Sequence, residues 1–169
     1  MHTGTKLSFC VLAVLCCGQT QAASEAYVNV RVLSMELANK LALEANLACR
    51  KMGYQVTTTV VDRNGNLLAL VRDPLSGTHT IDISMQKAKT AATFQTDTIS
   101  MVANSESGGL RFTGGVAFIG GGVPVRVGGH FYGAVGVSGA PTKKITGDVD
   151  DECARKGLES IQEAIEFAE

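Results

Sequence analysis

The chain has 169 residues, of which 45% are hydrophobic and 18% are charged. This length fits one domain with a substantial core, and the composition excludes extended disorder. The formal net charge is −1 and no lysine- or arginine-rich run is present, so we expect neither nucleic acid nor an anionic membrane as a partner.

The N-terminal residues have the pattern of a secretory signal peptide. A lysine precedes an apolar run over residues 7–17, which is too short to span a bilayer. Thr20 and Ala22 occupy the two positions that must be small, so we expect cleavage after Ala22, with cleavage one residue later as the alternative. The chain is therefore divided into a signal peptide, 1–22, and a single secreted or periplasmic domain, 23–169.

Export places the cysteines in an oxidising compartment. Three of the five lie in the signal peptide, which leaves Cys49 and Cys153 in the mature chain. One such pair can form one disulfide, but the sequence does not decide whether it does. Each cysteine falls on the apolar stripe of a predicted helix, so we expect both to be buried. The absence of a CxxC motif or a Cys/His cluster disfavours structural zinc and covalently attached haem.

The first part of the domain predicts a helix followed by a β-hairpin. Apolar residues recur at helical spacing between Ser34, which is an expected N-cap, and Gly53, which is an expected stop. Strand-like runs then cover 56–61 and 67–71. Asn64-Gly65 between them predicts a tight turn in which both residues have positive φ.

Three further helices are expected. One covers 83–94 with Thr80 and Asp82 as caps, and a shorter one covers 98–103. The last begins near Asp148, and its first turn carries carboxylates that meet the positive end of the helix dipole: Asp150, Asp151 and Glu152.

The stretch 114–139 is dense in glycine and has valines at alternating positions, which predicts three short strands joined by tight turns. Gly133 and Gly136 lie inside the last of these strands, so we expect close approach to the backbone there, either by a neighbouring helix or by a ligand. Together these elements predict an α+β fold with a central antiparallel sheet of about five strands flanked by helices.

Few residues point to chemistry. The chain has no P-loop, only a loose dinucleotide-like glycine pattern, and a serine motif that misses the hydrolase elbow by one residue. Two histidines remain after cleavage, and His130 is interpreted as a solvated turn residue. Arg72, His79 and Lys87 fall within one loop–helix unit, which would either bind an anionic ligand or serve only in helix capping and surface charge.

Thr90 and Thr93 stand inside an alanine-rich helix, where threonine is unfavourable. Their hydroxyls would either donate back to helix carbonyls or face a pocket. The sequence does not separate these two interpretations.

Five segments, taken together and in order, resemble the GlcG/HbpS haem-binding family. They are Arg72–Asp82, Lys87–Phe94, Gly120–Val125, Gly133–Ala140 and Asp150–Leu158, and the resemblance extends over about 33–165. The chain departs from the family at Lys89, where an aromatic residue is common, and in an insertion of seven residues over 141–147.

This resemblance implies a profilin-like α+β fold, self-association and, in some members, haem binding or sensing. It also implies that the first and last helices pack together, which would bring Cys49 close to Cys153. For a haem site the candidate contacts are His79 as the iron ligand, Thr90 and Thr93, with Arg72 and Lys87 as partners for the propionates.

The sequence therefore predicts an exported, homo-oligomeric haem-binding protein without catalytic residues of its own. A weak haem-degrading activity would draw its chemistry from the cofactor. The alternatives are a protein that binds a small anionic metabolite in the same pocket, and an oligomeric interaction module without enzymatic activity.

Overall fold

We describe the fold from a computed structural model, which covers residue 1 and residues 26–105 and 112–168. The predicted signal peptide and its cleavage site lie outside the described residues and stay a prediction. No helix in the described part of the chain is long and apolar enough to cross a membrane.

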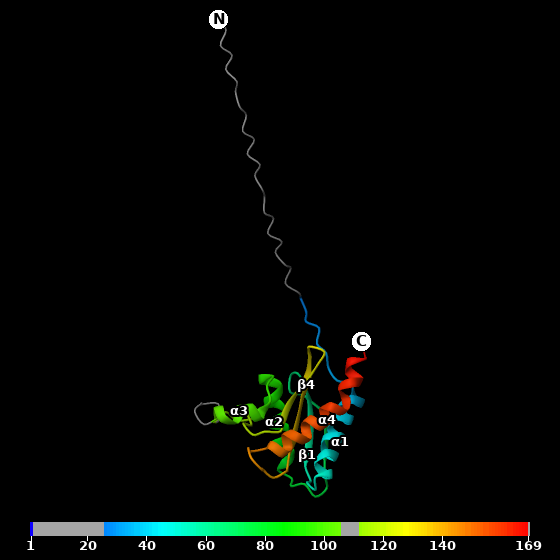
Figure 1. Ribbon diagram of the computed structural model, residues 1–169, viewed down its shortest axis with the longest axis vertical. Coiled ribbons are helices and arrows are strands. Elements are labelled where there is room, and N and C mark those ends of the chain that lie inside the picture. The colour runs from blue at the N-terminus through cyan, green and yellow to red at the C-terminus, as the bar shows by residue number, and fades with distance from the viewer. Residues whose placement is uncertain (2–25, 106–111, 169) are drawn as a thin grey trace.

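The helices and strands form three layers. Their order is α1 (Met35–Lys51), β1 (Thr57–Asp62), β2 (Leu67–Arg72), α2 (Thr80–Phe94), α3 (Thr98–Met101), η1 (Val102–Ser105), β3 (Gly122–Val127), β4 (His130–Ser138) and α4 (Asp148–Glu166). The strands make one antiparallel sheet in the order β2-β1-β4-β3. Helices α1 and α4 cover one face of this sheet, and α2 covers the other (Figure 1). The expected α+β architecture, profilin-like in kind, is confirmed.

Alternation along β1 assigns its side chains to the two layers, because successive residues of a strand point to opposite faces. Thr57 and Thr59 face α2, where their hydroxyls bond to Thr80 and Ser84 at 2.6 and 2.8 Å. Val60 faces the opposite way and belongs to the larger apolar cluster, which α1 and α4 complete. The face of β1 toward α2 therefore carries two hydroxyls, and both are hydrogen-bonded.

The expected strand before Gly120 does not form, so the sheet has four strands in place of about five. Backbone groups in this segment bond to helix side chains instead of a neighbouring strand. The N–H of Ala117 donates to the Thr90 hydroxyl at 2.9 Å, and the carbonyl of Ile119 accepts from the Thr98 hydroxyl at 2.7 Å. These bonds replace the ladder that a strand would need.

The hairpin between β1 and β2 is confirmed, but its turn differs from the expected type. Gly65 has a φ of 82°, whereas Asn64 is not among the residues with positive φ. The Asp62 carboxylate accepts the backbone N–H groups of Asn64 and Asn66 at 2.8 and 2.9 Å. This aspartate therefore organises a longer loop with a single left-handed glycine, as in the three-residue hairpin class.

The helix starts were predicted with mixed success. Ser34 is the N-cap of α1, as expected, and its hydroxyl accepts an N–H of the first turn. The predicted capping of α2 by Thr80 and Asp82 is wrong, because α2 begins at Thr80 and its N-cap is His79. The Thr80 hydroxyl instead donates to the Gly77 carbonyl at 2.6 Å.

Gly136 is explained by helix packing. A Cβ at this position would lie 2.1 Å from the Ser84 carbonyl oxygen and 2.6 Å from the Ala88 nitrogen. Helix α2 thus rests directly on the backbone of β4. Gly133 is approached by a neighbouring strand, since a Cβ there would lie 2.1 Å from the Val61 carbonyl oxygen. Of the two interpretations of these glycines, packing accounts for both.

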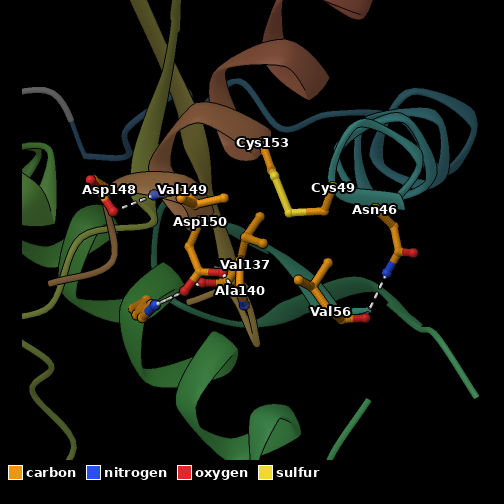
Figure 2. Close-up of a disulfide and its surroundings, with 10 residues drawn as sticks. Asn46, Cys49, Val56, Val137, Ala140, Asp148, Val149, Asp150 and Cys153 are labelled. Carbon is orange, nitrogen blue, oxygen red and sulfur yellow. Dashed lines mark hydrogen bonds and ion pairs between the residues drawn. A yellow bond between two sulfur atoms is a disulfide. The ribbon is translucent and has the colours of Figure 1, made fainter. Parts of the chain in front are cut away.

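A disulfide joins Cys49 of α1 to Cys153 of α4, with both cysteines fully buried and their Cα atoms 5.4 Å apart (Figure 2). The two helices lie side by side, and Gly157 of α4 permits the contact, because a Cβ there would lie 2.6 Å from the Ala45 Cβ. The predicted burial and nearness of the cysteines are confirmed.

Reduction of this disulfide should lower the free energy of unfolding by about 4.7 kcal/mol, the effect expected in the chain-entropy model for a loop of about 100 residues. The cysteines are 104 residues apart in sequence. Urea unfolding with and without reductant measures the difference, and a Cys49→Ala/Cys153→Ala variant should match the reduced protein. Thiol counting on the unfolded, unreduced mature domain should find no free thiol; two free thiols would contradict the bond.

Candidate functional site

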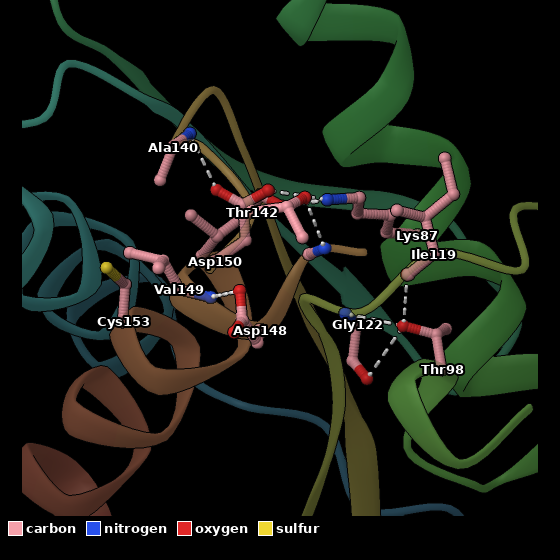
Figure 3. A network of polar contacts seen from close by, with 12 residues as sticks. Lys87, Thr98, Ile119, Gly122, Ala140, Thr142, Asp148, Val149, Asp150 and Cys153 are labelled. Atoms are coloured by element: carbon pink, nitrogen blue, oxygen red, sulfur yellow. Dashed lines mark hydrogen bonds and ion pairs between the residues drawn. The ribbon is translucent and has the colours of Figure 1, made fainter. Parts of the chain in front are cut away.

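A buried ion pair lies between α2 and α4. The Lys87 ammonium donates to the Asp150 carboxylate at 2.7 Å and to the Val137 carbonyl at 2.9 Å (Figure 3). The other Asp150 oxygen accepts the Ala140 N–H at 2.9 Å. The side chains of both partners are almost fully buried, at 2% and 4% exposure. The pair therefore connects two helices on opposite faces of the sheet through the end of β4.

Burial dominates the electrostatics of this pair. It lowers the pKa of Lys87, against the opposing effect of the Asp150 carboxylate. It raises the pKa of Asp150, against the opposing effect of the Lys87 ammonium. Both pKa shifts have the direction that desolvation imposes on a buried charge.

The glycine triplet 120–122 packs over this ion pair. A Cβ at Gly121 would lie 2.8 Å from the Asp150 Cβ and 3.1 Å from the Lys87 ammonium nitrogen. A Cβ at Gly122 would lie 2.4 Å from the Lys87 carbonyl oxygen. The triplet is therefore required by close packing against polar groups inside the protein.

The segment 141–147, which the family resemblance predicts to be an insertion, takes part in the same packing. Its Thr146 carbonyl accepts the Gly120 N–H at 2.9 Å, and Gly147 lies against the Gly120 backbone. The Asp148 carboxylate accepts the N–H groups of Lys143 and Lys144 at 3.0 and 2.7 Å. The segment 141–147 thus packs against the first residue of the glycine triplet.

A second charged group lies beside the first. Arg155 donates to Asp151 at 2.7 Å and pairs with Asp97 at 3.0 Å, which connects α4 to the start of α3. Burial raises the pKa of Asp151, and Arg155 opposes the shift.

The five predicted site residues do not surround one cavity. Lys87 is buried with Asp150, and Thr90 is buried with its hydroxyl donating to the Gln86 carbonyl at 2.7 Å and accepting from Ala117. Thr93 and His79 are exposed at different ends of α2, about 21 Å apart at 1.5 Å per residue. Arg72 is the last residue of β2, and its guanidinium donates to the Ser76 carbonyl in the loop that leads into α2.

The loop before α2 leaves the His79 imidazole accessible. His79 is the N-cap residue, yet its side chain makes no capping bond. A Cβ at Gly77 would lie 2.6 Å from the His79 Cε1, so the ring lies over this glycine. The Arg72 guanidinium donates to the Ser76 carbonyl of this loop. Leu75, in the same loop, is 81% exposed.

Sequence reasoning missed the role of Asp150. It was interpreted as a first-turn carboxylate that complements the helix dipole, whereas the structure buries it against Lys87. The available signal was the glycine triplet together with Lys87 in an otherwise alanine-rich helix. A lysine among small residues on a buried stripe requires an acidic partner.

The chain matches a known protein family. The family model described as "Haem degrading protein HbpS-like" matches residues 33–159. The chain belongs to this family.

Two curated members of the family are similar in sequence. The protein GlcG of Escherichia coli K12 is 33% identical over 109 residues, which cover 63% of this chain and 81% of GlcG. An uncharacterised 15.0 kDa protein of Citrobacter freundii, from the dhaT–dhaS intergenic region, is 30% identical over 122 residues, covering 69% of this chain and 86% of that protein.

Solved structures of HbpS-like proteins share the fold. The crystal structure of HbpS has a TM-score of 0.74 at 32% identity and covers 80% of this chain and 94% of its own. ORFY of Klebsiella pneumoniae gives a TM-score of 0.74 at 27% identity, covering 82% and 96%. A PduOC structure described as a haem complex gives a TM-score of 0.67 at 24% identity, covering 77% and 95%, a likeness of fold.

Lys87→Met should lower the free energy of unfolding by about 3–5 kcal/mol, because it leaves the Asp150 carboxylate buried without its cation. Addition of Asp150→Asn should recover most of this loss, since the neutral amide can still accept the Ala140 N–H. Urea unfolding of the single and double variants measures both values.

Lys156→Met serves as the control for the loss of a lysine. Lys156 pairs with Glu159 at 3.1 Å on the surface of α4, so its loss should change stability by less than about 1 kcal/mol. If the losses from Lys87→Met and Asp150→Asn simply add, the two residues are not energetically coupled.

Proposed function

We propose that the mature domain is an exported haem-binding protein in which His79 is the iron ligand. The observation that carries this proposal is membership of the HbpS-like family, whose description names haem degradation, together with the 32% identity to HbpS. The described haem complex of PduOC, which has the same fold, adds support.

The chemistry of the donor set fits haem better than a free metal ion. In the described part of the chain, no three His, Cys, Asp or Glu side chains are placed to hold a metal. Haem brings four porphyrin nitrogens of its own, so one imidazole is sufficient as the protein ligand. His79 meets this requirement because its ring is exposed and carries no capping bond.

The surroundings of His79 fit the remaining parts of a haem. Leu75 offers exposed apolar contact for the porphyrin, and the positive charge of Arg72 at the same loop suits a propionate. The Arg72 Nε is buried and has no hydrogen-bond partner among the described residues. Lys87 is left out of this contact set, because its ammonium is already bonded to Asp150 and Val137.

Any haem degradation would take its redox chemistry from the bound cofactor. The residues of this chain would bind and orient the haem and limit its access to water. Thr93, which is exposed, is the next candidate as ligand if His79 does not serve. Thr90 is left out for the same reason as Lys87, because it is buried and its hydroxyl is bonded to Gln86 and Ala117.

His79→Ala should weaken haem binding and shift the Soret band, because the substitution removes the proposed iron ligand. A spectroscopic haem titration of the mature domain measures both effects. The substitution should leave the thermal unfolding midpoint nearly unchanged, since an exposed loop side chain contributes little to stability.

His130→Ala is the matched control, because it removes an exposed imidazole from the opposite end of the sheet. It should leave haem affinity and the absorption spectrum unchanged. An unchanged spectrum in His79→Ala would assign the iron ligand to another residue.

Export is part of the same proposal and has a separate test. The N-terminal sequence of the protein secreted by its native host should begin at Ala23 or Ser24, because cleavage is expected after Ala22 or Ala23. Recovery of the intact Met1 terminus from the soluble cytoplasm would contradict export.

A further inference from the structure

Basic side chains gather at the end of the sheet that lies opposite His79. Arg63 follows β1, Arg126 belongs to β3, His130 begins β4, and Arg31 comes from the segment before α1. We call these four residues the hairpin-end cluster. This grouping does not reflect an excess of basic residues in the chain, which has 15 Lys and Arg residues and 16 Asp and Glu residues.

The hairpin-end cluster is organised around the buried ring of Phe131. The Cζ atoms of Arg126 and Arg63 lie 5.0 and 5.7 Å from the centroid of this ring, which is the range of a cation–π contact. Arg126 also donates to the Gln95 side-chain oxygen at 2.6 Å, a neutral acceptor. Both guanidinium groups therefore contact the same aromatic ring, and Arg126 is also bonded to a neutral amide.

No carboxylate neutralises these two arginines within the described residues. The ion pairs of the described residues do not include Arg63 or Arg126. The nearest acidic residue in sequence, Asp62, accepts hydrogen bonds from Asn64 and Asn66 instead. The charge of Arg63, which lines the cavity described next, is therefore not offset by an ion pair with a described residue.

A cavity of about 290 Å³ opens at this point. It is lined by Asn29, Val30, Arg31, Arg63, His130 and Phe131, with no acidic residue among them. The volume is near the lower end of the range for small-molecule sites, so it suits a ligand of few atoms. The Arg31 guanidinium also donates to the Tyr132 hydroxyl at 3.4 Å, which directs it toward β4.

We propose that this cavity binds a small dianionic oxyanion, either a phosphate group or a dicarboxylate. The planar guanidinium fork matches both groups through paired N–H donors, and Asn29 supplies a neutral side chain. The cavity is distinct from the haem contacts proposed above. Helix α2 begins beside Thr57 at one end of β1, whereas Arg63 follows the other end of the same strand.

The test uses the mature domain without haem and two probes, inorganic phosphate and succinate, at constant low ionic strength with chloride as the balancing anion. NMR titration should give saturable shifts at residues 29–31, 63 and 130–131. The probe with the higher affinity identifies the class of anion. Arg63→Gln should weaken that affinity about tenfold or more, as expected for the loss of one charge-assisted hydrogen bond.

Lys40→Gln is the matched control, because it makes the same change of charge at an exposed position on α1. It should leave the affinity unchanged. Shifts that do not saturate, or equal weakening by Arg63→Gln and Lys40→Gln, would show general ionic screening and overturn the proposal. Displacement of the bound probe by haem would assign the cluster to the haem propionates and overturn it as a separate site. A failure of haem binding leaves this test unaffected.

Discussion

The buried contact between Lys87 and Asp150 is the constraint on which the packing around the C-terminal end of β4 depends. It joins α2 to α4 across the end of β4, and it fixes the position of the Val137 and Ala140 backbone groups. Because the pair must be enclosed, the chain that crosses it can carry no side chains, which accounts for the glycine triplet. Removal of either partner would leave the other charge buried without its counter-charge.

Local sequence patterns predicted most of the fold, because helical spacing, helix caps and hairpin turns depend on residues that are close in sequence. Helical spacing located α1, α2 and α4, and the Ser34 cap and the β1–β2 hairpin followed from short-range signals. The extra strand was wrong because alternating valines and glycines do not reveal what a backbone bonds to. Here the backbone groups of Ala117 and Ile119 bond to the side chains of Thr90 and Thr98, which are distant in sequence. The start of α2 was misplaced for a similar reason, since the Thr80 hydroxyl has a partner on β1.

The arrangement of the candidate site was harder to predict from the sequence than the fold. A loop–helix unit that contains Arg72, His79 and Lys87 looks like one cluster in the printed chain, yet α2 turns Lys87 inward and leaves His79 outside. Thr90 and Thr93 are likewise separated by one turn of helix, one buried and one exposed. Conversely, the two arginines that contact Phe131, Arg63 and Arg126, come from separate segments, and no local motif connects them. Spatial charge clusters of this kind appear only when the strands are placed side by side.

The disulfide has a topological consequence. Its two ends lie in the first and last helices, so the whole sheet, α2 and α3 fall inside one covalent loop. A single cut by a protease anywhere between the two cysteines therefore leaves both pieces in one molecule, still held at the contact between α1 and α4. Damage of that kind separates the fragments only after reduction. If the domain is exported as proposed, it works where proteases are common and reductants are scarce, and this connection keeps a cut chain in one piece.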